Sequence, residues 1–489
     1  MTNFSNYPPQ TSQGNLQILL ELAIDWSLAH GLVFRPPSTT SNNNIDNNNN
    51  SVIHAPISLF PSPFPRREFE LALELQPIFN RLFFELSQNH DFIKDVIEEV
   101  TKVDDFIEKL YNLYVTVRQE GVVQPISLGL HRSDYILHVS SNNHEEAHIQ
   151  QVEFNTIASS FSSLSSLTGE LHKYLLESTN YFDSSSPIFN IEALPENDSM
   201  NSIPRGIAKA HELYGSERAV VLMVVQSKER NIFDQRWIEY TLFKNHKVHL
   251  IRKDLSEISQ EGKLDPITKA LIIDGKEISV TYFRSGYSPR DHLSDEAWNT
   301  RLLIERSKSI KCPTAAYQLV GAKKVQQVLA APGVLERYIP DPLEVKKLRS
   351  CFAGLYPLDS SPEGEKAAKA ALENPERYVM KPQREGGGNN LYANDIPQLL
   401  SKLTPSERSS YILMDLIKPP PMKNIILLQG EMVKGEMISE LGVYGIIIGK
   451  GKEVIVNERG GHLLRTKGKE TNEGGVATGY AVIDSPLLF

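Results

Sequence analysis

Hydrophobic residues recur at helical spacing in two parts of the N-terminal region. Residues 16–29 place their apolar side chains on one helical face, and Gly31 follows as a C-terminal cap. Residues 69–113 also follow a mostly helical pattern. In contrast, residues 124–155 alternate between apolar and polar side chains, as strands and hairpins do. The first part of the chain is therefore predicted to combine amphipathic helices with β-strands.

A different pattern begins after residues 178–204, which are rich in Ser, Asn and Pro and form the best candidate boundary in the first half. Residues 219–225 are a continuous apolar run of strand length, and residues 227–231 form a polar loop. A helix is then indicated by aromatic residues at helical spacing: Phe233, Trp237 and Tyr240. A second predicted strand at 248–251 completes a βαβ unit of an α/β domain.

The rest of the chain alternates predicted strands with turns. Asp274-Gly275 lies between two β-rich runs and predicts a hairpin. Two glycine-rich segments follow, at 386–388 and 474–475. The runs near them that indicate strands are 377–380, 411–413 and 443–448. No internal repeat at a solenoid period is present in the sequence.

Length and composition limit the classes of protein that fit. A chain of 489 residues corresponds to about three domains at roughly 150 residues each. Its 51 basic and 60 acidic residues give a net charge of −9, so no dominant basic field indicates a nucleic-acid or anionic-membrane partner. Cys312 and Cys351 are too few for a disulfide framework or a zinc ribbon, and suit a reducing compartment.

The sequence shows no export signal and contains one low-complexity segment. Residues 1–15 lack the basic start and apolar run of a signal peptide. The longest compact apolar run, 219–225, is far shorter than the ~20 residues of a spanning helix, so a cytoplasmic protein is expected. Residues 41–50 include seven Asn and are expected to form a disordered surface insertion.

The segment Lys-Pro-Gln-Arg-Glu-Gly-Gly-Gly-Asn-Asn, at 381–390, follows a predicted strand. Its three glycines allow backbone amides to approach an anion, while Lys381 and Arg384 can neutralise phosphate oxygens. Glu385 could bring a hard cation to the same place. A solvated hairpin loop is the alternative. The segment is not a Walker loop, because no G-x-x-x-x-G-K-[ST] occurs in the chain.

Glu153 and Asn155 are two residues apart on a predicted strand, so their side chains share one face, while Val152 and Phe154 share the other. Mg²⁺ favours oxygen ligands and is often held by one or two carboxylates plus substrate phosphates. Glu153, Asn155 and Glu385 therefore form a chemically reasonable set of magnesium ligands. The alternative is that Glu-x-Asn is only the solvated face of a half-buried strand.

Two further loops carry charged residues. In the loop at 227–235, Asn231 is a credible helix N-cap, and loops that leave buried strands are where α/β sheets bind ligands. In the loop at 283–290, Arg284 and Arg290 could each bind a carboxylate through two nitrogens. Arg132, elsewhere in the chain, could do the same. The alternatives are that the first loop merely starts a helix and that the arginines are solvated surface charges.

Near the C-terminus, Arg465 and Lys467 alternate along a possible strand edge, so both could face an anion. The glycine pair at 474–475 would supply a mobile flap. A terminal loop with two solvated cations is the alternative.

Taken in order, these segments closely resemble eukaryotic-type glutathione synthetase over nearly the whole chain except the Asn-rich tract. The motifs that carry the resemblance are Leu130-x-Arg132, Glu153-x-Asn155, ERNIFDQ at 229–235, YFR-x-GY at 282–287, KKVQQ at 323–327, the segment 381–390, and RTK-x(5)-EGGVA at 465–477.

The resemblance implies an α/β protein with an ATP-grasp fold, in which two α+β units clamp ATP between sheets. The permuted eukaryotic form is expected, with an N-terminal part of the body at 14–215, an α/β substrate-binding domain at 216–322, and a C-terminal ATP-grasp and lid part at 323–489. The reaction implied is ATP plus γ-glutamylcysteine plus glycine giving glutathione, ADP and phosphate. Members of the family are typically homodimers, so a homodimer is expected.

The resemblance also implies site residues. The implied magnesium ligands are Glu153, Asn155 and Glu385. The implied ATP contacts are Glu153, Lys323, Lys381, Glu385, Gly386, Gly387, Gly388, Asn389, Asn390, Tyr392, Met414, Asp415, Leu416, Ile417, Glu440, Lys467 and Glu473. The implied peptide-binding set is Arg132, Ala158, Ser159, Ser160, Glu229, Arg230, Asn231, Gln235, Arg284, Ser285, Gly286, Tyr287, Arg465, Val476 and Ala477.

The implied chemistry is an acyl phosphate formed from the cysteinyl carboxylate and attacked by the glycine amine. It requires charge neutralisation, for which Lys381, Lys467 and Arg465 are the expected catalytic residues, and no nucleophilic side chain. Thr478 stands where many glycine-using members have a second Ala, while the retained Ala477 favours glycine over β-alanine. The alternatives are a non-catalytic homologue that binds nucleotide or thiol peptide, and a ligase with another acceptor.

Overall fold

The computed structural model describes most of the chain. The described residues are 7–37, 51–139, 147–182, 189–227, 229–383, 388–471, 475–476 and 479–489. Outside these ranges lie the Asn-rich tract at 41–50 and the following expected site or loop residues: Arg384, Glu385, Gly386, Gly387, Glu473, Ala477 and Thr478.

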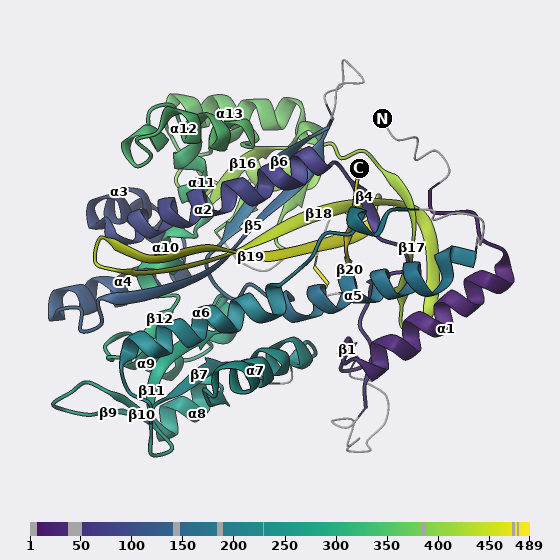
Figure 1. Cartoon of the computed structure of the whole chain (residues 1–489). Coiled ribbons are helices and arrows are strands. Elements are labelled where there is room, and N and C mark those ends of the chain that lie inside the picture. Colours follow the sequence, from purple (N-terminus) through teal and green to yellow (C-terminus); the bar gives the residue numbers. More distant parts are fainter. Residues whose placement is uncertain are drawn as a thin grey trace, which may run out of the picture.

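A seven-stranded sheet crosses the centre of the molecule (Figure 1). Its strands, in spatial order, are β17 (Met422–Leu428), β3 (Ile57–Ser58), β20 (Val482–Asp484), β19 (Glu453–Gly468), β18 (Glu431–Lys450), β5 (Ile126–His138) and β6 (His148–Asn155). All neighbours along this order pair antiparallel except β20 and β3. Residues 441–448 of β18 are buried without a break, because helices cover both faces of the sheet there.

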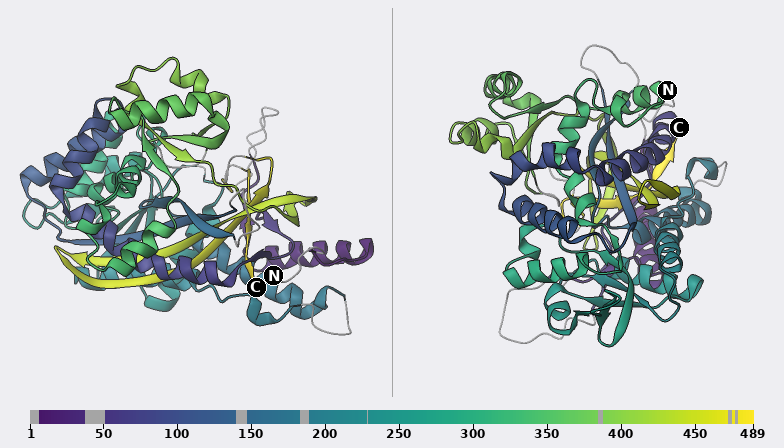
Figure 2. Two further views of the ribbon diagram at one scale, coloured as in Figure 1. Left: turned by 90° about the horizontal axis from the view of Figure 1, so that it is seen from above. Right: turned by 90° about the vertical axis from the view of Figure 1, so that its left-hand side faces the viewer.

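Helices pack on the two faces of this sheet and bury separate cores (Figures 1 and 2). On one face, α2 packs Phe79 and Phe83 against Phe154 of β6. On the other face, α5 and α6 contribute Leu171 and Ile207 to the core that includes Tyr444. The helices of this part are α1 (Gln13–Ala29), α2 (Arg66–Gln88), α3 (His90–Thr101), α4 (Asp105–Glu120), α5 (Ser162–Thr179), α6 (Ser199–Tyr214), α10 (Ala315–Val320), α11 (Lys323–Ala330) and α12 (Pro342–Ser350).

A six-stranded sheet lies on the side of α6 away from the larger sheet, at the bottom of Figure 1. Its strands are β8 (Leu250–Lys253), β7 (Val220–Val224), β11 (Lys276–Phe283), β10 (Leu271–Ile273) and β9 (Lys263–Leu264), with β12 (Ile310–Cys312) paired to β11. β8, β7, β11 and β12 run parallel, whereas β9 and β10 pair antiparallel at one side. Its helices are α7 (Ile232–His246), α8 (Leu255–Glu261) and α9 (Asp295–Glu305).

A four-stranded sheet lies on the opposite side of the molecule, at the top of Figure 1 and in the right-hand view of Figure 2. Its strands are β13 (Leu355–Pro357), β16 (Tyr411–Asp415), β14 (Tyr378–Pro382) and β15 (Leu391–Tyr392), and its helices are α13 (Pro362–Glu373) and α14 (Asp395–Leu400). The helices bury Met380 and Leu413 on one face of this sheet. A single bridge between Gln151 and Phe352 joins the segment before β13 to β6.

Short elements complete the described structure. The remaining strands are β1 (Val33–Phe34), β2 (Ile53–His54), β4 (Ser62–Phe64) and β21 (Pro486–Leu488). The 3₁₀ helices are η3 (Asn180–Phe182), η4 (Ile191–Ala193), η5 (Pro289–Asp291), η6 (Leu335–Arg337), η7 (Pro375–Arg377) and η8 (Glu407–Ser410). Within the described ranges, every helix is too short or too polar to cross a lipid bilayer.

The structure confirms the predicted first helix with Gly31 at φ +74°, the helices of residues 69–113, the βαβ unit and the Asp274-Gly275 hairpin. Other predictions need correction. The second strand of the βαβ unit begins at Leu250, two residues later than predicted. The predicted boundary at 178–204 includes the start of α6, which tolerates Pro204 in its interior. The predicted strand at 443–448 is the middle of the much longer β18.

Candidate active site

Polar residues from four strands share one face of the seven-stranded sheet. Across β6, β5 and β18, Glu153 is opposite Asp134, which is opposite Gly442. In the neighbouring rows, Asn155 is opposite Arg132, and Glu440 of β18 is opposite Arg465 of β19. Directly paired residues project from the same face of a sheet. The return of β18 beside β5 therefore gathers on one face predicted metal, ATP and peptide residues that lie far apart in the sequence.

Asp134 is the centre of this group and is fully buried. Arg132 contacts it with two nitrogens, Nε to Oδ1 at 2.6 Å and Nη2 to Oδ2 at 2.7 Å. Nη2 of Arg465 donates to Asp134 Oδ2 at 3.0 Å and also to Glu440. Asn155 Nδ2 donates to Asp134 Oδ2 at 3.0 Å. One carboxylate thus orients two arginines and the amide, and leaves less freedom for any of the three.

The charges of this group reinforce one another. Burial works against the cationic form of Arg465, but Glu440 and Asp134 outweigh it and raise the pKa of Arg465 above its ordinary value. Burial likewise opposes the charge of Arg132, yet Asp134 raises its pKa. Burial raises the pKa of Glu440, and Arg465 only partly opposes this. Both guanidinium groups therefore remain charged at the pH where an anionic substrate would bind.

Gly442 allows the Arg132–Asp134 pair to lie flat across β18. A Cβ at Gly442 would meet Arg132 Cδ at 2.8 Å and Asp134 Oδ1 at 2.8 Å. Both neighbours are buried and held by ionic contacts, so neither can move aside without loss. A side chain at this position would push apart the pair that organises the site.

We expect Gly442→Ala to lower the free energy of unfolding by about 1–3 kcal/mol, as overpacking of a filled site does. The matched control is Gly435→Ala on the same strand, where a Cβ meets only Met437 Cε at 3.8 Å. Chemical denaturation of both variants measures the difference. Equal stability of the two variants would show that the close approach at Gly442 has no energetic consequence.

Two lysines connect this face to the elements of the four-stranded sheet. Lys323, the first residue of α11, donates from Nζ to Glu153 Oε2 at 2.9 Å. Lys381 of β14 donates from Nζ to the carbonyl oxygen of Val152 at 2.8 Å. That carbonyl is available because the pairing of β5 with β6 skips Val152 in a β-bulge. The bulge therefore anchors a predicted phosphate-binding lysine next to the predicted metal ligands.

Glu153 is held in its ionised form by these cations. Burial on its own would raise the pKa of Glu153, but Lys323, Lys381 and Arg465 together hold it well below its usual range. The carboxylate is thus charged at neutral pH, as a ligand for a hard divalent cation must be.

The donor set fits the predicted magnesium ion in part. Asn155 uses its amide nitrogen on Asp134 and on the carbonyl of Arg132, so its amide oxygen is the atom that a cation could take beside Glu153. Among the described residues, no group of three or more His, Cys, Asp or Glu side chains could hold a metal ion. Glu385, the third predicted ligand, lies outside the described residues.

An apolar patch on the four-stranded sheet gathers three predicted ATP contacts that carry no charge: Met414, Tyr392 and Ile417. Met414 of β16, Val379 of β14 and Tyr392 of β15 lie in one cross-strand row. Ala353, Val379 and Met414 are buried there, and Tyr392 and Ile417 pack against them. β16 ends at Asp415, and the predicted ATP contacts Leu416 and Ile417 follow it. A flat apolar patch beside Lys381 suits the adenine ring of a nucleotide.

Lys467 lies on the same face as Arg465, two residues further along β19. Together with Glu440 they line one small hollow. The prediction that Arg465 and Lys467 lie on a strand edge is wrong, because β19 pairs with both β18 and β20. Arg465 is paired on both sides, with Glu440 of β18 and Ile483 of β20, which holds its backbone more firmly than an edge would.

The predicted peptide-binding loops meet at the carboxyl ends of β7 and β11. The chain passes from β7 to β8 on one side and then to β11 and β12 on the other, so the strand order reverses between β7 and β11. Ligands of open α/β sheets bind in the crevice at such a point. Glu229 and Asn231 follow β7, and Arg284 and Tyr287 follow β11.

Asp234 joins these loops to the seven-stranded sheet. It is fully buried in α7 and accepts hydrogen bonds from the amides of Phe161 at 2.8 Å and Ser163 at 3.0 Å. It also contacts Arg284 Nη1 at 3.3 Å. The loop held in this way begins at Ala158, and both Ala158 and Phe161 have positive φ angles, of 55° and 73°. Asp234 thus stabilises a loop conformation that non-glycine residues rarely adopt.

The loop also reaches Arg132. The carbonyl oxygen of Ser160 accepts a hydrogen bond from Tyr444 Oη at 2.6 Å and lies 3.5 Å from Arg132 Nη1. The predicted peptide residues Ala158, Ser159 and Ser160 therefore lie between Arg132 of the sheet and Arg284 of the α/β unit.

Several buried polar atoms of these segments have no hydrogen-bond partner among the residues that the structure describes. They are Ser159 Oγ, Asn231 Oδ1, Gln235 Nε2, Arg284 Nε and Arg465 Nε. Asn231 begins α7, but its side chain does not cap the helix as predicted, and its own amide donates to Glu229. Buried polar groups are nearly always paired. Such atoms gathered along the predicted peptide path indicate a polar ligand.

Three residues that organise the site were not predicted from the sequence: Asp134, Asp234 and Gly442. Asp134 had a signal, because it follows Arg132 at strand spacing and so shares its face. Asp234 lies inside the motif at 229–235, but only the fold shows its contact with residues 161–163. Nothing local distinguishes Gly442 from other strand glycines. Arg290, grouped with Arg284 in the prediction, is exposed.

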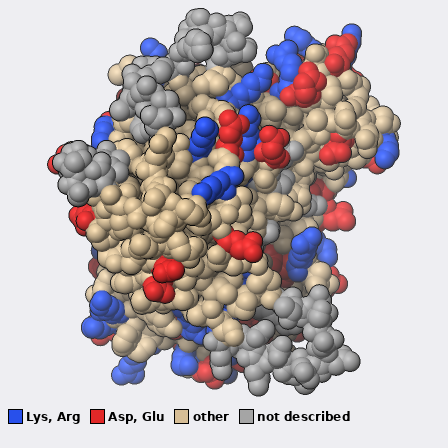
Figure 3. Space-filling model, turned by 90° about the vertical axis from the view of Figure 1, so that its right-hand side faces the viewer, with Lys and Arg blue, Asp and Glu red and all other residues tan. Residues whose placement is uncertain are grey.

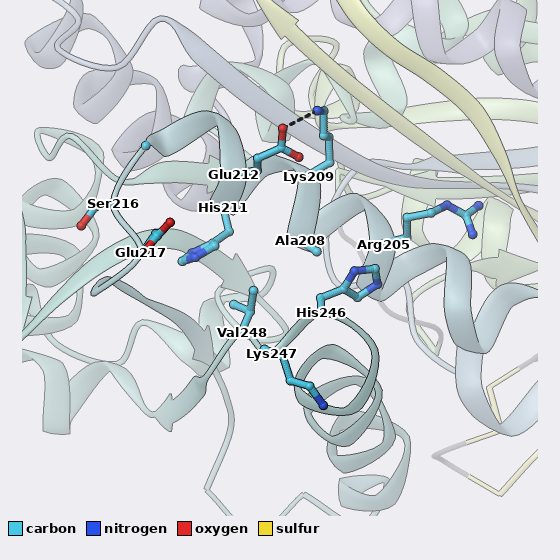
Figure 4. A pocket seen from close by; sticks show the side chains of 11 residues that line it. Arg205, Ala208, Lys209, His211, Glu212, Ser216, Glu217, His246, Lys247 and Val248 are labelled. Carbon is cyan, nitrogen blue, oxygen red and sulfur yellow. Dashed lines mark hydrogen bonds and ion pairs between the residues drawn. The ribbon is translucent and has the colours of Figure 1, made fainter.

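Other features of the surface do not contain the predicted site. A groove of about 740 Å³ between α6 and α7 is lined by Arg205, Lys209, His211, His246 and Lys247, among others (Figure 4). None of its lining residues belongs to the predicted site. On the face shown in Figure 3, acidic and basic side chains are intermixed and neither sign forms a broad patch. The cationic residues of the site lie instead in the interior: Lys323, Lys381 and Lys467 are buried, and Arg465 is half-buried.

Comparison with known proteins identifies the family. The family described as "Eukaryotic glutathione synthase, ATP binding domain" matches residues 13–488. The chain belongs to the eukaryotic glutathione synthase family. As a member of this family, it is an ATP-dependent ligase that forms a C–N bond. This confirms the resemblance, and the activity expected from it.

Relatives in the glutathione synthase family match over almost their whole length. The glutathione synthetase of Dictyostelium discoideum is 42% identical over 97% of this chain and 99% of its own. That of Homo sapiens is 43% identical over 96% of each chain. A solved structure of a glutathione synthetase-like effector from Globodera pallida covers 98% of this chain and 100% of its own, with a TM-score of 0.75 and 23% identity. The last comparison supports the α/β fold, consistent with the ATP-grasp type.

Proposed function

We propose that the face of the seven-stranded sheet around Asp134 and the loops at the ends of β7 and β11 form one active site for glutathione synthesis. The substrates are ATP, γ-glutamylcysteine and glycine, and the products are glutathione, ADP and phosphate. The observation that carries this proposal is that Lys323 pairs with Glu153, Lys381 bonds to the neighbouring carbonyl of Val152, and Arg465 lies on the same face of the sheet. A polyanion and an acidic peptide would meet there.

A carboxylate must be activated before an amine can attack it, because its oxygen is a poor leaving group. The cysteinyl carboxylate attacks the γ-phosphorus of ATP, which releases ADP and gives an acyl phosphate. The glycine amine then attacks the acyl carbon and displaces phosphate as the amide forms. Neither step needs a nucleophilic side chain, in agreement with the two buried cysteines, since burial raises the pKa of both thiols.

The residues have separable roles in this scheme. The charge of the phosphoryl group during its transfer is neutralised by Lys381, Lys467 and Arg465. Glu153 and Asn155, with Glu385, would hold Mg²⁺, which when bound supplies further charge neutralisation to the phosphates. Met414, Ile417 and Tyr392 form the adenine side of the nucleotide site. Arg132, Arg284 and the loop at 158–160 hold the carboxylates and backbone of the peptide.

Three further features complete the proposal. The chain functions as a cytoplasmic homodimer without nucleic acid or membrane partners. It is divided into an N-terminal body at 14–215, an α/β substrate-binding domain at 216–322, and a C-terminal ATP-grasp and lid part at 323–489. The glycine-rich segments at 386–388 and 474–475 close over the acyl phosphate and protect it from water.

A coupled ADP-release assay tests the proposal. We expect turnover with γ-glutamylcysteine only when an acceptor is present, and faster with glycine than with β-alanine or serine. ADP release should also depend on added Mg²⁺. Turnover that is faster with β-alanine or serine would identify a ligase with another acceptor. Absence of turnover with every acceptor would contradict the enzymatic role itself.

A further inference from the structure

Asp291 makes several hydrogen bonds to residues 285–288, in the predicted peptide-binding loop that follows β11. It ends η5, four residues after Tyr287. Its Oδ2 accepts hydrogen bonds from the amides of Tyr287 at 3.2 Å and Ser288 at 3.1 Å, and from the Ser288 hydroxyl at 3.0 Å. Its Oδ1 accepts from the Ser285 hydroxyl at 3.0 Å. One carboxylate therefore holds the turn from Ser285 to Ser288.

The same carboxylate connects this turn to the loop that follows β7. Gln226 Nε2 donates to Asp291 Oδ1 at 2.9 Å and lies 3.3 Å from Tyr287 Oη. Gln226 lies two residues beyond the end of β7 and three before Glu229, the first predicted peptide contact of that loop. The bond from Gln226 to Asp291 thus spans the crevice where the strand order reverses.

The turn at 284–288 is also held by residues other than Asp291. Gly286 adopts a φ of +93°, and its carbonyl oxygen is held by Gln318 Nε2 at 2.9 Å from the side of α10. Arg284, at the start of the turn, is buried against Asp234. A groove of about 460 Å³ opens on the far side of Asp291, lined by Gln226, Ser285 and Arg290 among others. The amide of Arg284 also donates to the carbonyl oxygen of Val224 at 2.8 Å, so Gln226 and Asp291 add a further link between the two loops beyond the end of the paired strands.

We infer that Asp291 is a positioning residue for γ-glutamylcysteine. It sets the spacing between the loop after β7 and the loop after β11, and so places Arg284 and Tyr287 at the peptide. This role rests on the proposed function, because it assigns the peptide to these loops. Asp291 does not touch the ATP side of the site, so its loss should affect the peptide alone.

Steady-state kinetics of Asp291→Asn test this role. Asn keeps the size of the side chain but replaces one acceptor oxygen by a donor, so the bonds from the turn and from Gln226 cannot all persist. We expect the KM for γ-glutamylcysteine to rise about tenfold, while kcat and the KM for ATP stay within about twofold, as loss of binding common to ground and transition states predicts. The matched control is Asp295→Asn, an exposed aspartate whose side chain pairs with Lys109 of α4.

A second variant covers the case in which Asp291→Asn does not fold. Gln226→Met removes the bond across the crevice and leaves the four bonds within the turn. It should raise the same KM, and less than additively in combination with Asp291→Asn, because both variants break the same contact. A parallel fall in kcat and melting temperature with no change in this KM would indicate a structural role only and would overturn the inference.

Arg284→Gln, measured alongside, tests the site assignment independently. If this variant raises the KM for γ-glutamylcysteine but Asp291→Asn and Gln226→Met leave it unchanged, the role of Asp291 is wrong and the proposed site stands. If the KM is unchanged in all three variants, the assignment of the peptide to these loops is wrong, and the role of Asp291 with it.

Discussion

Replacement of Arg465 by Gln is expected to lower kcat for glutathione formation by about 10²- to 10³-fold, the effect of removing one preorganised electrostatic group. Arg465 lies between Asp134 and Glu440 on the face that also carries Glu153. Without its charge, these buried carboxylates would repel the phosphoryl group that the site must attract. Loss of one partner from a buried ion pair should also lower the free energy of unfolding by about 3–5 kcal/mol.

Two variants separate these effects. Arg465→Lys keeps the charge but not the fork that reaches both carboxylates, and should recover most of the stability and only part of kcat. Arg459→Gln is the matched control, because Arg459 lies on the same strand and is exposed. Measurement of kcat and of chemical denaturation for all three variants distinguishes catalysis from folding. A kcat of Arg465→Gln close to that of Arg459→Gln would contradict the catalytic assignment.

Replacement of Glu153 by Gln is expected to lower turnover by about 100-fold at saturating ATP, as loss of a charged group at a metal-assisted site does. Glu153 forms an ion pair with Lys323 at 2.9 Å, and it is charged because Lys323 and Lys381 overcome the effect of burial on its pKa. Gln has the same shape but no charge. The concentration of Mg²⁺ required for half-maximal turnover should therefore rise as well.

A titration of activity against Mg²⁺ measures both effects. Glu436→Gln is the control, since Glu436 lies on β18 and forms an exposed ion pair with Lys469 at 3.0 Å. Its Mg²⁺ dependence should match that of the unmodified protein. If Glu153→Gln reaches normal turnover with an unchanged Mg²⁺ requirement, Glu153 serves only as the ionic partner of Lys323 and is not a metal ligand.

Much of the architecture was predictable because it depends on local patterns. The apolar run before Gln226 predicts β7 within one residue, and the spacing of Phe233 and Trp237 predicts α7. The same period-two argument placed Glu153 and Asn155 on one face, which the structure confirms. These predictions succeed because the periodicity of side chains follows directly from backbone geometry.

Predictions failed where the outcome depends on distant segments. No local pattern shows that β19 pairs on both sides, which makes Arg465 an internal residue rather than one at an edge. The bulge at Val152 depends on the register of β5 against β6. Only the tertiary structure brings Lys381 to the carbonyl oxygen that the bulge leaves out of the strand pairing. The helix-capping prediction for Asn231 failed, because its side chain accepts no amide of the first turn of α7, and the one bond to Glu229 uses the amide of Asn231 itself.

The sequence alone determined the family, the reaction expected from it, and the identity of most residues proposed for the site, because motif order and residue chemistry are linear properties of the chain. The tertiary structure alone decided how those residues are held. Asp134, Asp234 and Asp291 each join segments that the chain separates, and Gly442 is required only because a buried ion pair crosses it. Such contacts follow from strand register and packing between sheets, which side-chain periodicity does not specify.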